Sequence, residues 1–184
     1  MENDFLLIKE CQSGSIEAFN EIVRTNREQI HKLAYHITGN FEDANDISQE
    51  VFIRAYKSIN TFKGNASVST WLRRIAINLS INHIKKESKH QNTREIFREE
   101  DYSSLLRHIS TPLDIIETKE LSQRISESIR SLPLKERIVF VLQVQHGLSY
   151  REIADSVCCP LGTVMSRLDR ARRILRDKLK DYIV

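Results

Sequence analysis

The chain has few of the residues that interrupt helices: five glycines and three prolines among 184 residues. Leucine, isoleucine, glutamate, lysine and arginine are abundant instead, and this composition favours an all-helical protein. No apolar run is long enough to cross a membrane, and the first residues, MENDF, are polar and acidic, unlike a secretion signal. We therefore expect a cytoplasmic, all-α protein that does not insert into a membrane.

Cysteines are also scarce and poorly spaced for structural roles. Cys158 and Cys159 are adjacent and cannot easily bridge each other, Cys11 is the third, and no C-x-x-C pair occurs. We expect neither a disulfide framework nor a cysteine-based metal site.

The patterns of common catalytic sites are missing. His31 and His36 lie five residues apart, which misses the four-residue spacing of a helical metal-binding pair, and neither an H-E-x-x-H motif nor a P-loop occurs. Paired carboxylates occur within residues 41–53, the segment expected to form an acidic helix. We expect no enzyme activity, no cofactor and no metal site.

Net charge is small but strongly segregated. A formal charge of +3 and a pI near 8.8 do not by themselves indicate nucleic-acid binding. Between Phe41 and Ile53, however, every charge is negative, whereas residues 165–180 are strongly basic. This segregation predicts two partners, one basic and one polyanionic.

The most informative stretch is 149–175, which has the pattern of a helix-turn-helix. Ser149 and Glu152 form an S-x-x-E capping box that begins a helix. Pro160 cannot continue that helix, and Gly162 opens a second one whose surface is crowded with arginines. In this motif the second helix enters the major groove, so the pattern predicts DNA contact. The alternative is a helical hairpin with a solvated basic face.

Helical periodicity divides the chain into two small helical domains, 1–88 and 112–184, joined by a flexible linker over 89–111. A short helix near 96–106 is expected within the linker. A polar loop over 61–70 is expected to precede a helix capped by Ser69 or Thr70. The expected longer helices each carry one apolar face and cover residues 15–39, 41–59, 69–86, 113–131, 134–146, 149–157 and 162–181.

Three motifs then occur in a characteristic order. They are DANDISQEVF over 43–52, TWLRRIAINLSINHIKK over 70–86, and SYREIAD with GTVMSRLDRARRIL within 149–175. In this order the chain resembles a bacterial extracytoplasmic-function sigma factor, the small group that keeps only regions 2 and 4 of larger sigma factors. The resemblance covers nearly the whole chain except the linker and the extreme termini, and it implies region 2 in the first domain and region 4 in the second.

The resemblance implies that the acidic helix binds core RNA polymerase at the clamp helices of the β′ subunit, with the β subunit as a further partner. The residues to which the resemblance assigns polymerase binding are Asp43, Asp46, Ile47, Gln49, Glu50 and Phe52. The polar members share neighbouring helix surfaces, and such rows steer association with a basic partner. The alternative is that the acidic side chains only complement the helix dipole and are otherwise solvated.

The segment that follows resembles the part of these factors that opens and reads the −10 promoter element. The residues carried over are Phe62, Asn65, Ser67, Arg73, Arg74, Asn78, Asn82, Lys85 and Lys86. A polar loop can hydrogen-bond a flipped base, Phe62 offers a stacking surface, and amide and basic side chains suit base edges and phosphates. Trp71 is expected to belong to the core.

In the second domain, the resemblance makes the basic helix the reader of the −35 element. The residues carried over are Tyr150, Arg151, Thr163, Ser166, Arg167, Arg170 and Arg173. Arginine pairs bidentately with guanine, whereas hydroxyls suit phosphates. The alternative to DNA contact for Arg173 and its neighbours is that they are ordinary solvent-exposed charges. Cys158 stands where the family commonly has glycine; a positive φ there would cost about 1 kcal/mol. A redox switch at Cys158 and Cys159 stays open.

These expectations combine into a sigma factor that binds core RNA polymerase and directs promoter-specific initiation, in response to an envelope or other stress. The resemblance also implies an anti-sigma factor, which could hold the protein at a membrane. The alternative is a helix-turn-helix repressor or activator that binds DNA without polymerase, as a dimer on spaced half-sites.

Overall fold

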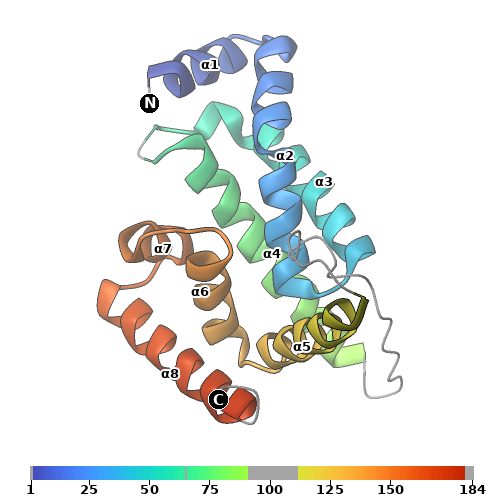
Figure 1. The fold of residues 1–184 in the computed structure, drawn as a ribbon. Coiled ribbons are helices and arrows are strands. Elements are labelled where there is room, and N and C mark those ends of the chain that lie inside the picture. The colour runs from blue at the N-terminus through green and yellow to red at the C-terminus, as the bar shows by residue number, and fades with distance from the viewer. Residues whose placement is uncertain (1, 65, 91–111, 181–184) are drawn as a thin grey trace.

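The computed structural model describes residues 2–64, 66–90 and 112–180 (Figure 1). Within these ranges the chain is all-helical, as predicted, and contains no strand. The elements are α1 (Glu2–Gln12), α2 (Ile16–Thr38), α3 (Phe41–Ser58), the 3₁₀ turn η1 (Ile59–Thr61), α4 (Val68–His90), α5 (Pro112–Arg130), α6 (Leu134–Val144), α7 (Tyr150–Val157) and α8 (Leu161–Leu179). No helix in the described ranges is long and apolar enough to span a membrane.

Helices α2, α3 and α4 form the body of the N-terminal unit, and α1 lies across one end of it (Figure 1). Ser15 begins α2 by accepting a hydrogen bond from the Ala18 amide at 3.2 Å, and Gly39 ends it with a φ of 78°. Asn40 begins α3 immediately afterwards by accepting from the amides of Glu42 and Asp43. This abrupt stop and restart folds α3 back along α2.

Helices α7 and α8 form the predicted helix-turn-helix, and α6 packs against both of them. The capping box is present: the Ser149 amide donates to the Glu152 carboxylate at 2.9 Å, and the Glu152 amide donates to Ser149 Oγ at 3.3 Å. Cys158 follows α7 with a φ of 51°, the left-handed conformation that glycine adopts most easily. The turn therefore keeps its geometry with a cysteine at this position.

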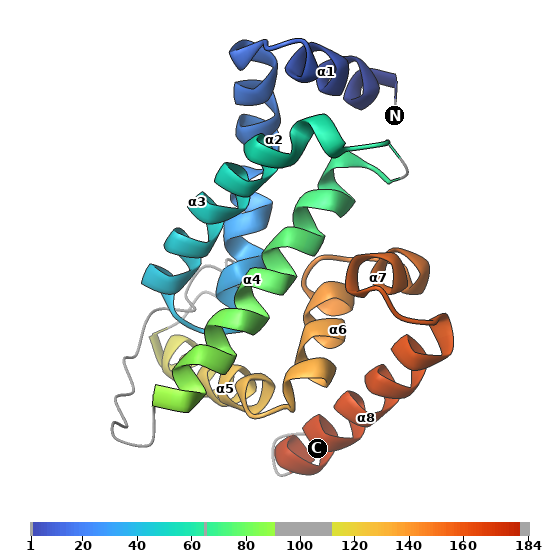
Figure 2. The same cartoon turned by 180° about the vertical axis from the view of Figure 1, so that it is seen from behind.

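The two units pack against each other in this structure. In both views α4 lies between the other helices of the N-terminal unit and α6 and α7 (Figure 2). Buried side chains of the two units, including Leu33 and Leu72 from one and Leu142 and Ile153 from the other, belong to one contiguous apolar cluster. The sequence pattern predicted each unit but not this packing.

Several local predictions need correction or extension. The first turn of α4 starts two residues earlier than expected, so Ser67, rather than Ser69 or Thr70, caps it. The Ser67 hydroxyl accepts a hydrogen bond from the Thr70 amide at 3.2 Å. Helix α1 was not predicted. Helix α4 runs to His90, and the expected linker helix at 96–106 lies outside the described residues.

Candidate polymerase and nucleic-acid interface

The acidic helix α3 exposes a stripe that joins polar and apolar side chains. Asp46 and Gln49 are exposed, and one and two turns further along, Ile53 and Tyr56 are 47% and 52% exposed. The spacing of three, four and three residues places all four on one side of the helix. We call these four residues the α3 stripe.

The other predicted docking residues lie off the α3 stripe. Ile47 and Phe52 are buried at 5% and 8% exposure, so they belong to the core of this structure rather than to a contact surface. Glu50 pairs with Arg54 on the same helix at 2.6 Å, and Asp43 lies 3.1 Å from the His83 ring. Sequence analysis missed Ile53 and Tyr56 because apolar residues at helical spacing also suit a core position.

The candidate −10 surface begins at the junction of η1 and α4. Phe62 and Trp71 face each other with ring centroids 4.8 Å apart. Trp71 is half-buried rather than a full core residue, so the expectation for it was only partly right. The two rings border a shallow hollow of about 250 Å³, lined by Thr61, Phe62, Lys63, Ala66, Trp71 and Arg74.

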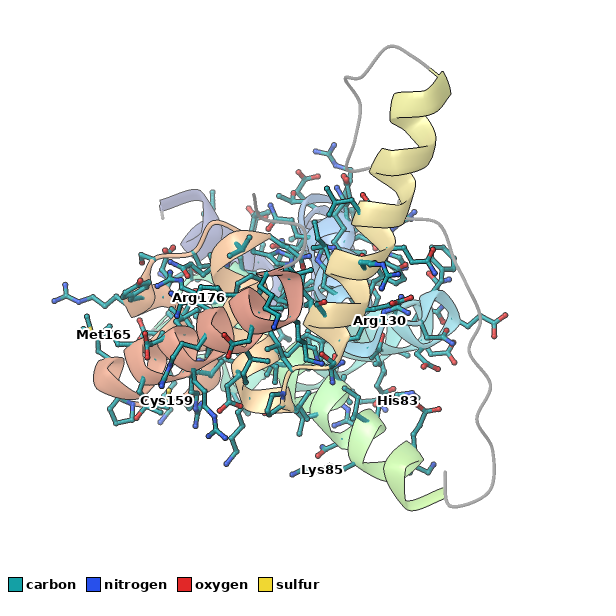
Figure 3. All side chains as sticks on the ribbon, turned by 60° about the horizontal axis from the view of Figure 1, so that its bottom comes forward. His83, Lys85, Arg130, Cys159, Met165 and Arg176 are labelled. Carbon is teal, nitrogen blue, oxygen red and sulfur yellow. The ribbon has the colours of Figure 1, made fainter. Side chains whose placement is uncertain are left out.

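Past this hollow, a polar face follows α4. Arg74, Asn78, Asn82 and Lys85 recur every three or four residues, and the last three are exposed with Lys86. Figure 3 shows Lys85 projecting away from α4. Ser67 is engaged in capping rather than free to contact a base, and Asn65 lies outside the described residues.

The candidate −35 surface is the exposed face of α8. Ser166 and Arg170 are exposed there, and Thr163 and Arg167 are half-buried. Met165 is also 51% exposed, on the flank of α8 away from Thr163 and Arg167, and it was not predicted. Figure 3 places Met165 and Cys159 at the same end of α8, with Arg176 further along the helix.

Several arginines of this surface are held by neighbouring side chains. Arg167 donates to Cys159 Sγ at 3.8 Å, and Arg170 lies 3.5 Å from the buried carboxylate of Glu136. Arg172 donates to Gln143 at 2.8 Å and to the Tyr150 hydroxyl at 3.4 Å, and the bond from Arg172 to Tyr150 is the main cause that lowers the pKa of Tyr150. Arg173 pairs with Asp169 at 3.1 Å, while Arg151 is exposed. These contacts orient the basic side chains before any ligand arrives.

The interface between the units occupies part of the −10 surface. Arg74 Nε donates to the backbone carbonyl of Asp155 on α7 at 2.7 Å. Arg73 is half-buried, and burial lowers its pKa while the Glu152 carboxylate opposes that shift. Both predicted DNA-binding arginines therefore face the C-terminal unit in this arrangement.

A histidine pair lies at the same interface. His36 Nδ1 on α2 is 3.4 Å from Nε2 of His146, which follows α6. Burial lowers the pKa of both rings to about 4, and the charges of Lys32 and Arg73 act in the same direction at His146. At neutral pH both rings are uncharged, so they can pack together between the units.

The α3 stripe, the hollow with aromatic walls and the basic helix-turn-helix follow one another in the order expected of a transcription initiation factor of the sigma type, and the family comparisons show that class. Residues 22–90 match the family model for Sigma-70 region 2, and residues 122–175 match that for Sigma-70, region 4. The chain belongs to the sigma-70 family, in its extracytoplasmic-function group.

Curated relatives match along nearly their whole length. The chain is 40% identical over 178 residues to the ECF RNA polymerase sigma factor SigW of Bacillus subtilis, covering 95% of each chain. It is 34% identical over 186 residues to the ECF RNA polymerase sigma-E factor of Escherichia coli K12, covering 98% of this chain and 96% of the relative.

Two solved structures share the fold. CnrH, solved in complex with the cytosolic domain of CnrY, superposes with a TM-score of 0.71 at 22% identity, over 99% of both chains. The sigma factor RpoE of Bartonella quintana, solved in complex with the anti-sigma factor NepR, gives a TM-score of 0.70 at 22% identity, over 90% of this chain and 98% of that chain.

Proposed function

We propose that this sigma factor docks on core RNA polymerase through the α3 stripe, with the clamp helices of the β′ subunit as the main partner and the β subunit as a further one. The observation that carries this assignment is the stripe itself. Its acid and amide groups steer a basic partner, and the exposed Ile53 and Tyr56 supply apolar surface that becomes buried when a partner binds. Exposed side chains of this kind concentrate binding energy in interfaces.

The −10 element would then bind along η1 and α4. The hollow beside Phe62 and Trp71 is small enough to suit a single base rather than a drug-sized ligand, and its aromatic walls can stack on that base. Asn78, Asn82, Lys85 and Lys86 continue from the hollow along α4 and can hold base edges and phosphates.

The −35 element would bind the exposed face of α8. Ser166, Arg170 and Arg173, which are exposed, would contact DNA there, with Thr163 and Arg167 beside them and Tyr150 and Arg151 as phosphate anchors. Because Arg74 is bonded to α7 in the present arrangement, binding both promoter elements together requires the units to separate. Binding to polymerase would supply the free energy for that separation.

A protein partner of the anti-sigma type is also part of the proposal. Its support is that one similar fold was solved with an anti-sigma factor and another with a cytosolic domain of a second protein. The site of action is the cytoplasm, where polymerase meets promoter DNA, and the factor responds to an envelope or other stress. Promoter selection requires no covalent chemistry from this chain, so we propose no enzyme activity.

Run-off transcription with purified core polymerase and promoter fragments from the same genome tests this function. Specific transcripts should depend on the protein and disappear in Asp46→Ala/Gln49→Ala. Gln123→Ala/Glu127→Ala is the matched control, because it removes an exposed amide and acid from one face of α5. No stimulation, together with tight promoter binding by the free protein, would instead indicate a repressor or activator.

A further inference from the structure

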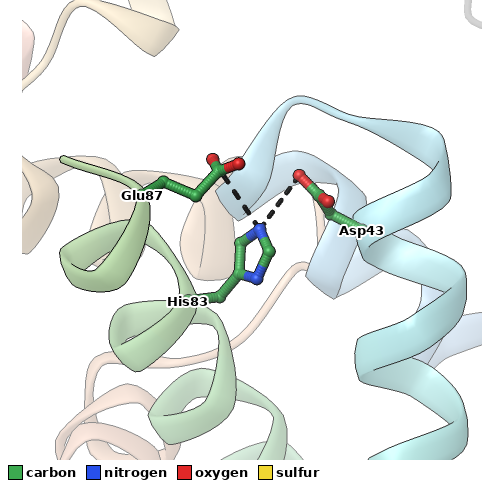
Figure 4. A group of neighbouring side chains, drawn as sticks. All are labelled: Asp43, His83 and Glu87. Carbon is green, nitrogen blue, oxygen red and sulfur yellow. Dashed lines mark ion pairs between the residues drawn. The ribbon is translucent and has the colours of Figure 1, made fainter. Parts of the chain in front are cut away.

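Helices α3 and α4 bring together three side chains that commonly bind metal ions (Figure 4). Asp43 lies in the first turn of α3, and His83 and Glu87 lie one turn apart on α4. One ligand atom from each residue lies within 4.8 Å of the other two. The group contains one imidazole nitrogen and two carboxylate oxygens, so it is more than a cluster of acidic residues.

Both carboxylates converge on the same ring nitrogen. His83 Nε2 is 3.1 Å from Asp43 Oδ2 and 3.7 Å from Glu87 Oε2. That nitrogen is shielded from solvent, and among the described residues it has no hydrogen-bond partner of good geometry. A single N–H cannot satisfy two acceptors on different sides equally well. A cation placed among the three atoms would use the nitrogen lone pair and one oxygen of each carboxylate.

We propose that Asp43, His83 and Glu87 form a binding site for one divalent transition-metal ion of the Zn²⁺, Co²⁺ or Ni²⁺ class. Zinc bonds to nitrogen and oxygen of about 2.0–2.2 Å separate two ligand atoms of a tetrahedral site by roughly 3.3–3.6 Å. His83 Nε2 lies 3.1 and 3.7 Å from the two carboxylate oxygens, close to that spacing. The imidazole ligand favours these metals over Mg²⁺ and Ca²⁺, which prefer oxygen alone. Water completes the coordination on the side of Glu87, whose side chain is 48% exposed.

Two other groups of side chains compete as metal sites and must be separated from this one. His36 and His146 place two ring nitrogens 3.4 Å apart at the interface between the units. They supply only two ligand atoms, whereas the group of three potential metal ligands among the described residues is Asp43, His83 and Glu87. Cys158 and Cys159 offer two adjacent thiols. A metal probe must therefore report both its location and its ligand type.

Occupation of the site ties the first turn of α3 to the second half of α4. The ligands come from positions 40 and 44 residues apart in sequence, so the unfolded chain does not present them together. A metal that binds the native state alone raises the melting temperature, and the rise grows with the logarithm of the metal concentration once that exceeds Kd. This linkage does not depend on the role of either helix in transcription.

Titration of the full-length protein with Co²⁺ tests the proposal, with binding followed by visible absorption and by thermal unfolding. We expect saturation near one Co²⁺ per chain, weak d–d bands without a thiolate charge-transfer band, and an upward shift of the melting temperature. His83→Ala should abolish all three signals. Glu87→Gln, which keeps the size of the side chain, should weaken binding at least about tenfold.

His146→Ala is the matched control and should leave the titration unchanged. Loss of binding in His146→Ala, retention of binding in His83→Ala, or a thiolate charge-transfer band would each assign Co²⁺ to another group and overturn the proposal. Absence of saturable binding to the unaltered protein would overturn it as well, and the three side chains would then only be a polar contact between α3 and α4.

Discussion

Acidification should open the interface between the two units by charging His36 and His146. Burial holds the pKa of both rings at about 4 in the packed arrangement, against a value near 6.5 in water. Because the pKa is depressed, the packed state binds fewer protons than the separated state. The stability of the interface is therefore complete above about pH 6.5 and is lost progressively as the pH falls towards 4.

The size of the effect follows from these pKa values. At about pH 5 each histidine would favour separation by about 2 kcal/mol, from a shift of about 2.5 pKa units at 1.36 kcal/mol per unit, reduced by incomplete protonation. The positive charges of Lys32 and Arg73 and of the partner ring oppose protonation in the packed state, so they act in the same direction. The pair together supplies roughly 2–4 kcal/mol, enough to change the dominant arrangement.

Small-angle X-ray scattering measures this opening directly. The radius of gyration of the unaltered protein should rise between about pH 7.5 and pH 5, while circular dichroism shows that helix content is kept. His36→Gln/His146→Gln keeps neutral hydrogen-bonding side chains but cannot titrate, so its radius should change much less. An equal expansion of both proteins would refute the histidine mechanism and assign the pH response to carboxylates.

Three further predictions concern the surface and the helix ends. Ile53→Asp should weaken polymerase binding at least about tenfold in a fluorescence titration. Because the side chain is exposed, the free energy of unfolding should change by less than about 0.5 kcal/mol. A large loss of stability would place Ile53 in the core. Ser149→Ala should lower the free energy of urea unfolding by about 1 kcal/mol through loss of the α7 cap, and no change would mean that the capping box adds nothing. Cys158→Gly should raise that free energy by up to about 1 kcal/mol by relieving the left-handed backbone, and destabilisation would show that the thiol's own contacts outweigh the strain.

Local sequence signals predicted most of the fold because the physics at those positions is local. The capping box of Ser149 and Glu152 and the glycine stop at Gly39 involve residues within one or two helical turns, and both are present. The packing of the two units could not be predicted in the same way. An apolar face shows that something covers it but does not name the partner. The sequence of α4 does place apolar residues, Leu72 and Ile77, on different sides of the helix, and both are buried in the structure.

The residues of the candidate sites also differ in whether a local sequence pattern could predict them. The acidic half of the α3 stripe follows from the motif, whereas Ile53 and Tyr56 could be separated from core positions only by seeing them exposed. His83 and Glu87 have the four-residue spacing of a helical ligand pair in the sequence itself. Their third partner, Asp43, is 40 residues away from His83, and only the packing of α3 on α4 brings it within reach.

The packed arrangement also explains why a factor with two DNA-binding surfaces would bind DNA weakly alone. Arg74 is bonded to α7, so a promoter must either displace that contact or wait for the units to separate. The apparent affinity is the intrinsic affinity multiplied by the fraction of molecules that are open. If the interface is worth about 3 kcal/mol, that fraction is below about one in a hundred, and promoter affinity falls by the same factor.

Polymerase that holds the units apart removes this penalty and adds the gain from joining two modules on one DNA. Variants that loosen the interface without touching α8, such as His36→Lys, which adds a positive charge beside Lys32 and His146, should therefore strengthen DNA binding by the free protein while leaving holoenzyme binding nearly unchanged. An equal gain in both would show that the interface does not limit access.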